Sequence, residues 1–408
     1  MTWIRRAAVA VLGAAVALAL AIPQVAGLAE EPVAIGVLVT QSPPGSVIQG
    51  TQVLDGLNIA AAMINHRGGV LGRPLKLVVE DTSGLPEKGR SGAEKLITRD
   101  HVVAITGEHQ SSVCLAEIEV VHRYGVPYVN TNCWADAVRE KGYPEVFNTS
   151  PWNSLVSEAM ARVIKDMGVR RIVAFAENTD YGIGQAKVLE QKLKELSPGT
   201  AFTYQVVDRT ASDFTPTILP LRTNPPDMVV TILLPPAGYL LMNQLYEQGI
   251  APAPRTWLFD GSGISDYPDF WDNVKAAGKY LISLGFYHPR MKLTPFGVQV
   301  RDAYVRQTKH EPGRLIFQAA DSLLVLADAL RRAGSTDHAA VIRALSTTRV
   351  LGTRGTITFT KGHGATFQQW TGIPYVVYQF TDVRQALEET RLIAGPGVAL
   401  DVHRLLKP

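Results

Sequence analysis

The stretch from Val102 to Trp134 constrains the fold most, because its pattern is that of a strand, a helix and a second strand. Apolar residues 102–105 predict a buried strand, and residues 126–129 predict another. Between them, residues 113–124 carry apolar side chains at roughly helical spacing. A βαβ connection of this kind is right-handed and makes its two strands parallel, so the loops after both strands emerge at one edge of the sheet.

Two loops of this unit are therefore expected to face one crevice, with Ser111 and Ser112 on the first loop and Asn132, Cys133 and Trp134 on the second. Ser111 or Ser112 is predicted to cap the helix, which brings hydroxyl and free backbone N–H groups together at the positive end of the helix dipole. Such an end suits a carboxylate or another anionic group. The alternative is a capped helix that binds no ligand.

The N-terminal residues 1–29 have the pattern of a signal peptide. Arg5 and Arg6 precede an apolar run over residues 7–22, and small residues follow, so cleavage is expected near Ala29. No cysteine lies near this position, so a lipid anchor is not expected and the mature protein should be free in the periplasm. The alternative is an uncleaved anchor, and no later apolar run is long enough to predict a membrane span.

Composition narrows the function. About 380 of the 408 residues remain after such cleavage, which is enough for two domains with a core each. The net charge of +3 and the scattered Lys and Arg residues do not favour nucleic-acid binding. Two cysteines and nine scattered histidines give a metal site little support, and no cofactor is expected.

Cys114 and Cys133 are the only cysteines, and both are expected at the edge of the crevice. Export would place them in an oxidising compartment, so we predict a disulfide between them. Closing this loop would stabilise the fold by roughly 3 kcal/mol in the chain-entropy model. The alternative is two free thiols.

The rest of the chain alternates short apolar strands with amphipathic helices, which predicts an α/β fold of doubly wound parallel sheets. Residues 40–50, rich in Pro, Gly and Ser, are predicted to form a loop. The pattern restarts after Pro151 and predicts a second lobe of the same class. Strands are expected at residues 33–39, 75–80, 171–176, 202–207, 228–234, 256–259, 280–284, 356–359 and 375–380, and helices at 51–65, 86–99, 154–167, 185–196, 215–222, 237–248, 296–308 and 317–332. The tail 381–408 is only weakly patterned.

Several segments, taken in order, resemble the Leu/Ile/Val-binding proteins, which are type I periplasmic solute-binding proteins of ABC importers. They are residues 36–45 (GVLVTQSPPG), Gly56 with residues 60–72, residues 80–84 (EDTSG), Gly107–Ser112, residues 124–128 (YGVPY), residues 178–184 (NTDYGIG) and Asp213-Phe214. Each segment alone is a weak signal. Together and in order they are specific to the family, although not to one ligand.

The resemblance implies two lobes, joined by three crossovers, that close on a small ligand. The crossovers are expected near Ser150, Gly285 and Pro374. Lobe 1 would then comprise residues 30–149 and 286–373, and lobe 2 residues 150–285 and 374–408.

The resemblance also implies which residues bind the ligand. Ser111 matches the family's serine that holds the ligand carboxylate, with His109 and Gln110 beside it. Residues 132–134 match the next ligand loop, where the family often has small residues and Thr or Ser. Tyr181 matches the tyrosine of the second lobe that closes over the ligand, and the alternative is a tyrosine packed in a turn.

The segment 258–263 departs from the family's amino-acid binders. Those proteins carry a Glu near Ser262 to pair with the ligand ammonium, because a buried charge needs a partner. Here only Asp260 offers a carboxylate, two positions away, and Leu234 stands where the family has an aromatic wall residue. The pocket is therefore expected to prefer an acid without an amino group. Aromatic partners for such an acid would be Trp134, Trp152 and Tyr181, and the alternative is that both tryptophans belong to the lobe cores.

The sequence does not favour catalysis. Ser111 lies outside any G-x-S-x-G motif, no H-E-x-x-H motif is present, and Lys187 occupies the position of the last glycine of a dinucleotide fingerprint. We expect a monomeric importer protein that delivers a small solute to permease subunits. That solute would be a branched-chain or hydrophobic amino acid, or an aromatic or organic acid or amide. The alternative is a sensory module that presents the bound solute to a membrane receptor.

Overall fold

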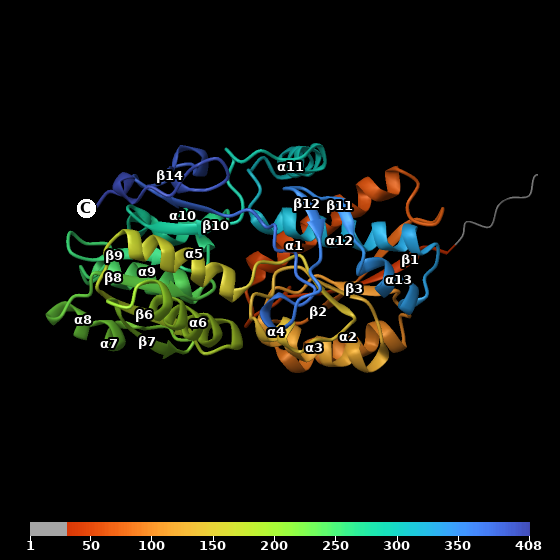
Figure 1. The fold of residues 1–408 in the computed structure, drawn as a ribbon, viewed down its shortest axis with the longest axis horizontal. Helices are drawn as coiled ribbons and strands as arrows, with labels where there is room; N and C mark the ends of the chain where they lie inside the picture. Colours follow the sequence, from red (N-terminus) through yellow and green to blue (C-terminus); the bar gives the residue numbers. More distant parts are fainter. Residues whose placement is uncertain (1–30) are drawn as a thin grey trace, which may run out of the picture. The chain divides into compact units, whose positions relative to one another are not determined.

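The computed structural model describes residues 31–408, which contain two α/β units, each built on its own sheet (Figure 1). The expected signal peptide over residues 1–29 lies outside the described residues. Within residues 31–408, no helix is both long enough and apolar enough to cross a membrane. The predicted α/β class is confirmed.

The first sheet has the strand order β2-β1-β3-β4-β5, and all of its strands are parallel. Its strands are β1 (Val33–Val39), β2 (Leu75–Asp81), β3 (Ala104–Thr106), β4 (Tyr128–Asn130) and β5 (Val146–Asn148). The helices between or beside them are α1 (Val47–His66), α2 (Pro86–Thr98), α3 (Ser111–Tyr124) and α4 (Ala137–Glu140). Together they form a doubly wound unit.

The run of apolar residues in β1 is explained by burial on both faces of the first sheet. Val37 joins the core that also contains Val53 of α1, whereas the next residue, Leu38, joins the core that contains Ile118 of α3. Successive strand residues point to opposite faces, so a strand covered on both sides reads as a continuous apolar run instead of an alternating one.

The second sheet has the order β14-β13-β10-β9-β8-β6-β7. Its strands are β6 (Arg171–Glu177), β7 (Ala201–Val207), β8 (Met228–Ile232), β9 (Trp257–Asp260), β10 (Ile282–Gly285), β13 (Val376–Gln379) and β14 (Arg391–Ala394). Its helices are α5 (Asn153–Asp166), α6 (Asp180–Leu196), α7 (Thr215–Ile218), α8 (Pro220–Thr223), α9 (Ala237–Glu247) and α10 (Phe270–Val274). The strands β6 to β10 are parallel, as expected.

The two last strands of this sheet depart from the all-parallel expectation. β13 runs antiparallel to β10, and β14 runs antiparallel to β13. β13 enters after the chain has passed through the first unit, so the right-handed crossover that enforces parallel pairing does not apply to it. The weakly patterned tail is therefore a structural part of this sheet, and the Gln379 side chain also holds the backbone of Leu406 through two hydrogen bonds.

The chain passes between the two sheets after β5, after β10 and again before β13. The segment between the last two passages contains α11 (Pro295–Thr308), α12 (Arg314–Ala333), α13 (His338–Leu345), β11 (Arg349–Leu351) and β12 (Thr356–Thr358). α12 packs on α1 although the two helices are distant in sequence (Figure 1). Gly56 permits this approach, because a Cβ there would lie 2.5 Å from the carbonyl oxygen of Ile316. The exact lobe boundaries stay a prediction.

Several predicted element starts are wrong. α1 begins at Val47, inside the segment 40–50 that was expected to be a loop, and β3 begins two residues later than predicted, at Ala104. α3 already includes Ser111, so its cap residue is Gln110, which makes no side-chain capping bond.

An acidic residue holds the loop that precedes α3, and the predicted serine cap is not formed. The buried carboxylate of Glu108 accepts hydrogen bonds from the backbone N–H groups of His109 and Gln110, at 2.8 and 2.9 Å. It also accepts a bond from the hydroxyl of Thr82 at 2.8 Å. A carboxylate at this position suits the positive end of the helix and fixes the loop that carries His109.

Candidate ligand-binding site

Each sheet reverses its strand order once in its parallel part, between β1 and β3 in the first and between β6 and β8 in the second. In open α/β sheets, ligands bind in the crevice beyond the carboxyl ends of the strands at such a reversal. The loops that follow β3, β4, β6, β8 and β9 all begin at these ends. The two sheets therefore supply two sets of loops that can share one ligand.

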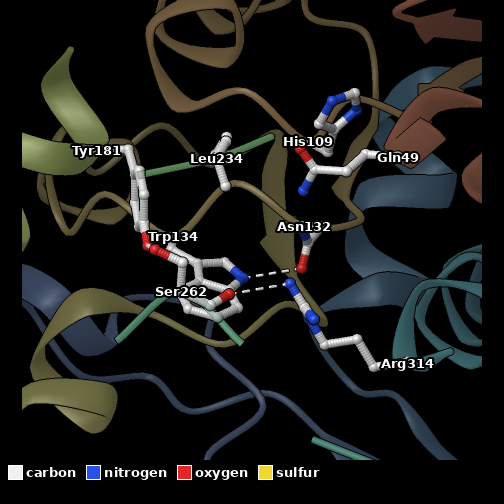
Figure 2. A pocket seen from close by; sticks show the side chains of 8 residues that line it. All are labelled: Gln49, His109, Asn132, Trp134, Tyr181, Leu234, Ser262 and Arg314. Carbon is white, nitrogen blue, oxygen red and sulfur yellow. Dashed lines mark hydrogen bonds between the residues drawn. The ribbon is translucent and has the colours of Figure 1, made fainter. Parts of the chain in front are cut away.

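One cavity at these strand ends is lined by side chains from both units (Figure 2). Its volume is about 10 Å³, enough for about one water molecule, so the two units would have to separate to admit a solute. The lining residues are Gln49 on α1, His109 after β3, Asn132 and Trp134 after β4, Tyr181 on α6, Leu234 after β8, Ser262 after β9 and Arg314 at the start of α12. In Figure 2, Tyr181 and Leu234 lie on one side of the cavity, and Gln49, His109 and Arg314 lie on the other.

Arg314 brings a buried positive charge to this cavity. Its Nη1 donates to the carboxylate of Asp266 at 2.5 Å and to the carbonyl of Gly263. Its Nη2 donates to the hydroxyl of Tyr267 at 2.6 Å and to the carbonyl of Ser262 at 3.1 Å. Burial would lower the pKa of Arg314, but Asp266 and the other acidic groups around it together outweigh that effect and raise the pKa, so the guanidinium stays charged. Its Nε is buried and has no partner among residues 31–408.

His109 is a neutral polar group in the same cavity. Burial lowers the pKa of His109 to about 3, and the positive charges of Arg209 and Arg314 lower it further. Neither of its ring nitrogens has a hydrogen-bond partner in the described chain, and neither has Oε1 of Gln49. Buried polar atoms without partners are costly, so the cavity presents several groups that a solute or water can satisfy.

The aromatic side of the cavity consists of Trp134 and Tyr181, whose ring centroids are 5.9 Å apart in an edge-to-face arrangement. The indole N–H of Trp134 donates to Asn132 Oδ1 at 2.8 Å (Figure 2). The Tyr181 hydroxyl donates to Ser262 Oγ at 2.8 Å. Trp134 also packs against the ring of Phe286 and the guanidinium of Arg314, each at 5.3 Å, so only part of the aromatic surface faces the cavity.

No carboxylate lines this cavity. Asp260, the acidic residue singled out in the sequence, lies beneath the loop that follows β9. Its Oδ1 accepts the backbone N–H groups of Ser262 and Gly263, at 2.9 and 3.1 Å, and its Oδ2 accepts the hydroxyl of Ser283. Burial raises the pKa of Asp260 to about 6. The structure thus places Asp260 as a support for the Ser262 loop.

The two serines of α3 lie outside the cavity lining. Ser111 Oγ accepts the backbone N–H of Ala135 at 3.0 Å, which ties the loops after β3 and β4 together. Ser112 Oγ accepts the backbone N–H of Asp180 at 3.2 Å and so connects the two units. Trp152 is buried in the core and is likewise absent from the lining.

Two further predicted residues have structural partners. Cys133 forms a disulfide with Cys114, as predicted, and both cysteines are fully buried. Gln110 lies beside a neighbouring cavity, where its Oε1 accepts from Nη1 of Arg209 at 2.7 Å. Of the ten predicted binding residues, the structure brings five into the cavity lining: His109, Asn132, Trp134, Tyr181 and Ser262.

Gln49 and Arg314 line the cavity although neither was predicted from the sequence as a binding residue. Gln49 was placed in a predicted loop, and it is a polar residue fully buried in the first turn of α1. Arg314 carried a usable signal, because a cation in the first turn of a helix is disfavoured by the helix dipole. An arginine directly after Gly313 and before a long apolar helix therefore indicates a specific acidic partner.

Two doubly wound α/β units with a shared cavity at their strand ends define a type I periplasmic solute-binding protein. The periplasmic binding protein family matches this chain over residues 32–375, and the chain belongs to that family. One relative, "Leu/Ile/Val-binding protein homolog 7" of Brucella suis biovar 1, is 25% identical over 312 residues, which are 73% of this chain and 76% of the relative.

Solved structures share the fold. The leucine-binding protein LivK of Thermotoga maritima superposes with a TM-score of 0.78 at 23% identity, covering 89% of this chain and 98% of that protein. A solute-binding protein of an ABC transporter from R. palustris, in complex with benzoate, gives a TM-score of 0.75 at 17% identity, covering 91% of this chain and 98% of that protein. The protein is thus a solute-binding protein of the type associated with branched-chain amino-acid ABC transporters.

Proposed function

We propose that this protein is the periplasmic solute-binding protein of an ABC importer and that it captures a small carboxylate-bearing solute without an ammonium group. The two units would close on the solute and present the closed form to permease subunits. The role is binding and delivery, without chemical change of the solute.

The observation that supports this most strongly is the charge of the cavity. Arg314 is buried beside it with an unpartnered Nε–H, and no carboxylate lines it. A solute carboxylate would find a charged donor at Arg314, whereas an ammonium would be buried without an acidic partner, which is costly. The relatives named above include a leucine-binding protein and a benzoate complex, so both solute types occur on this fold.

The shape of the cavity supports an apolar body on the solute. Tyr181, Leu234 and Trp134 provide aromatic and aliphatic surface, and the polar groups gather around Arg314 and His109. An aromatic or branched aliphatic acid fits this division, because its carboxylate and its apolar part need opposite surroundings.

The test is a calorimetric and thermal-shift comparison of matched solutes with the mature protein. Leucine and phenylalanine are compared with 4-methyl-2-oxopentanoate, 4-methylpentanoate, phenylpyruvate, 3-phenylpropionate and benzoate. Solutes that bind only the folded state raise the melting temperature. We expect the acids without an amino group to bind at least tenfold more tightly than the amino acids. Tighter binding of the amino acids would show that the cavity accepts a solute ammonium group.

Arg314→Gln tests the residue that carries the proposal. A hydrogen bond to a charged group contributes about 1.5–3 kcal/mol, so the variant should lose at least tenfold in affinity for any acid that binds. Arg332→Gln, at the other end of the same helix and outside the cavity, is the matched control and should keep its affinity. If both variants bind the acid equally tightly, Arg314 does not bind the solute.

A further inference from the structure

A second cavity adjoins the first, and its lining carries the groups of an anion site. Its volume is also about 10 Å³, so it would admit an acidic group only as the two units separate. Leu234 lines both cavities and therefore stands between them. The remaining lining residues are Pro44, Ser46, Gln110, Glu177, Arg209, Pro235 and Pro236.

Ser46 gives the first indication of an anion site. It is the N-cap residue of the 20-residue helix α1, yet its side chain makes no capping bond. Its hydroxyl is buried and has no hydrogen-bond partner among residues 31–408. A free hydroxyl at the positive end of a long helix is an arrangement that an anionic group can satisfy.

Arg209 gives a second, independent indication. Its guanidinium donates to Gln110 Oε1 at 2.7 Å and to the carbonyl of Gly84 at 3.3 Å. It forms no ion pair with any carboxylate of the described chain, although the charge of the buried Glu177 in the same cavity interacts with it. A half-buried cation whose hydrogen bonds go to neutral groups retains donors for an anion.

Glu177 is the one acidic side chain in this cavity, and it is already occupied. Its Oε1 accepts the hydroxyl of Thr179 at 2.7 Å, and its Oε2 accepts the backbone N–H of Leu234 at 2.8 Å. Burial raises the pKa of Glu177, and the positive charge of Arg209 opposes that rise. His109 lies within the electrostatic reach of both Arg209 and Arg314, which places the two cations around one stretch of the crevice.

We propose that Arg209, Ser46 and Gln110 form a second anion subsite beyond Leu234, so that the preferred solute is a small dicarboxylate or a similar dianion that spans both cavities. This inference rests on the proposed function, because it takes one carboxylate to be held at Arg314. It adds that the far end of the solute is acidic and that Leu234 sets the spacing between the two acidic groups.

The test uses pairs of solutes that differ in one carboxylate: terephthalate against 4-methylbenzoate, and adipate against hexanoate. Calorimetric titration at low salt should give at least tenfold tighter binding of the dicarboxylate in one or both pairs. Arg209→Gln should bring the ratio of the two affinities to within threefold of one, whereas Arg209→Lys should keep a clear preference. The exposed Arg222→Gln is the control for general loss of positive charge, and it should leave the ratio unchanged.

The ratio of dicarboxylate to monocarboxylate affinity distinguishes recognition of the second carboxylate from closure of the two units. Arg209 also bridges the two units, so its loss could weaken both solutes of a pair equally, and that result would contradict the subsite. A ratio near one in the unsubstituted protein would contradict it too. If monocarboxylates still bind and their binding depends on Arg314, the proposed function holds without the second subsite. If neither class of solute binds, both proposals are wrong.

Discussion

Arg314 on α12 and Asp266 in the loop after β9 form a fully buried ion pair, with 2.5 Å between Nη1 and Oδ1. The backbone N–H of Arg314 also donates to Asp266 Oδ2, at 3.1 Å. α12 packs on the helix α1 of the first unit, whereas Asp266 belongs to the second, so this pair joins the two units across the cavity. Removal of one partner from a buried pair of this kind destabilises the protein, because the other charge stays buried alone.

Asp266→Asn should therefore weaken solute binding by at least tenfold. The closed arrangement would then bury the Arg314 charge without a carboxylate partner, and the open form would gain in population. Calorimetric titration with the tightest acid found above measures the effect. Asp272→Asn is the control, because Asp272 is exposed and its contact with Arg384 lies at the surface. Equal affinities of both variants would show that the pair does not contribute to closure.

Ser111→Ala distinguishes the site expected from the family resemblance from the site seen in the structure. The hydroxyl of Ser111 accepts the N–H of Ala135, so its removal should lower the free energy of unfolding by about 1–3 kcal/mol, measured by urea denaturation. If Ser111 also held the solute carboxylate directly, the loss in affinity would match that of Arg314→Gln. We expect the affinity loss to be the smaller of the two.

Tyr181→Phe should lower the free energy of unfolding by about 1 kcal/mol and leave the solute affinity nearly unchanged, because the hydroxyl bonds Ser262 within the same unit and the ring is kept. Tyr181→Ala should lower the affinity, since the ring that faces Trp134 would be lost. Both variants are measured by calorimetry, and circular dichroism verifies that each is folded. An alanine variant that binds as well as the phenylalanine variant would show that the ring does not contact the solute.

The stability of the protein should depend on pH through Glu108. Burial raises the pKa of this carboxyl from 4.5 to about 7 in the folded state. A raised acid pKa means that the folded state holds its proton more tightly than the unfolded state, so this contribution is present below pH 4.5 and is lost as the pH rises towards 7. Glu108→Gln should therefore gain in unfolding free energy relative to the unsubstituted protein between pH 4.5 and 7. The exposed Glu87→Gln should show a constant difference over the same range.

The disulfide should stabilise the first unit. It closes a loop with a sequence separation of 19, for which the chain-entropy model gives roughly 3 kcal/mol. The double variant Cys114→Ser, Cys133→Ser should lose about that much unfolding free energy, measured by urea denaturation without reductant. Denaturation of the unsubstituted protein with and without dithiothreitol provides the comparison, and the double variant should not respond to the reductant.

Local pattern predicted the layout of the fold well. The strands that begin at Val33, Leu75 and Arg171 start where their apolar runs start, because such runs have one stable place, between two layers of helices. β13 was predicted as a strand, but its antiparallel direction and the strand β14 escaped prediction, because strand direction depends on where the chain re-enters the sheet. The start of α1 was misplaced for a related reason, because its first turn contacts the second unit, where Gln49 donates to the hydroxyl of Tyr267.

The residues of the candidate site likewise divide into those that were predictable from the sequence and those that were not. Asn132 and Trp134 were accessible from the sequence pattern, because parallel strands bring their carboxyl ends to one edge. His109, Tyr181 and Ser262 were accessible only through the family resemblance. Arg314 was not predicted, because it comes from a helix that reaches the cavity only by packing on α1. The acid-preferring character of the pocket was inferred from a missing glutamate. The cation that supports this inference is visible only in three dimensions.

The sequence by itself determined the class of the chain, the order of its α/β elements, the disulfide and the loops that face the crevice, since each follows from local periodicity and the geometry of parallel strands. The tertiary structure alone decided which polar groups face the cavity and which are consumed in support. Asp260 and Ser111 have their hydrogen bonds satisfied within the fold, whereas Arg314, His109 and Gln49 retain unpartnered atoms. That distinction depends on which partners lie within hydrogen-bond distance, and those partners come from segments far apart in the chain.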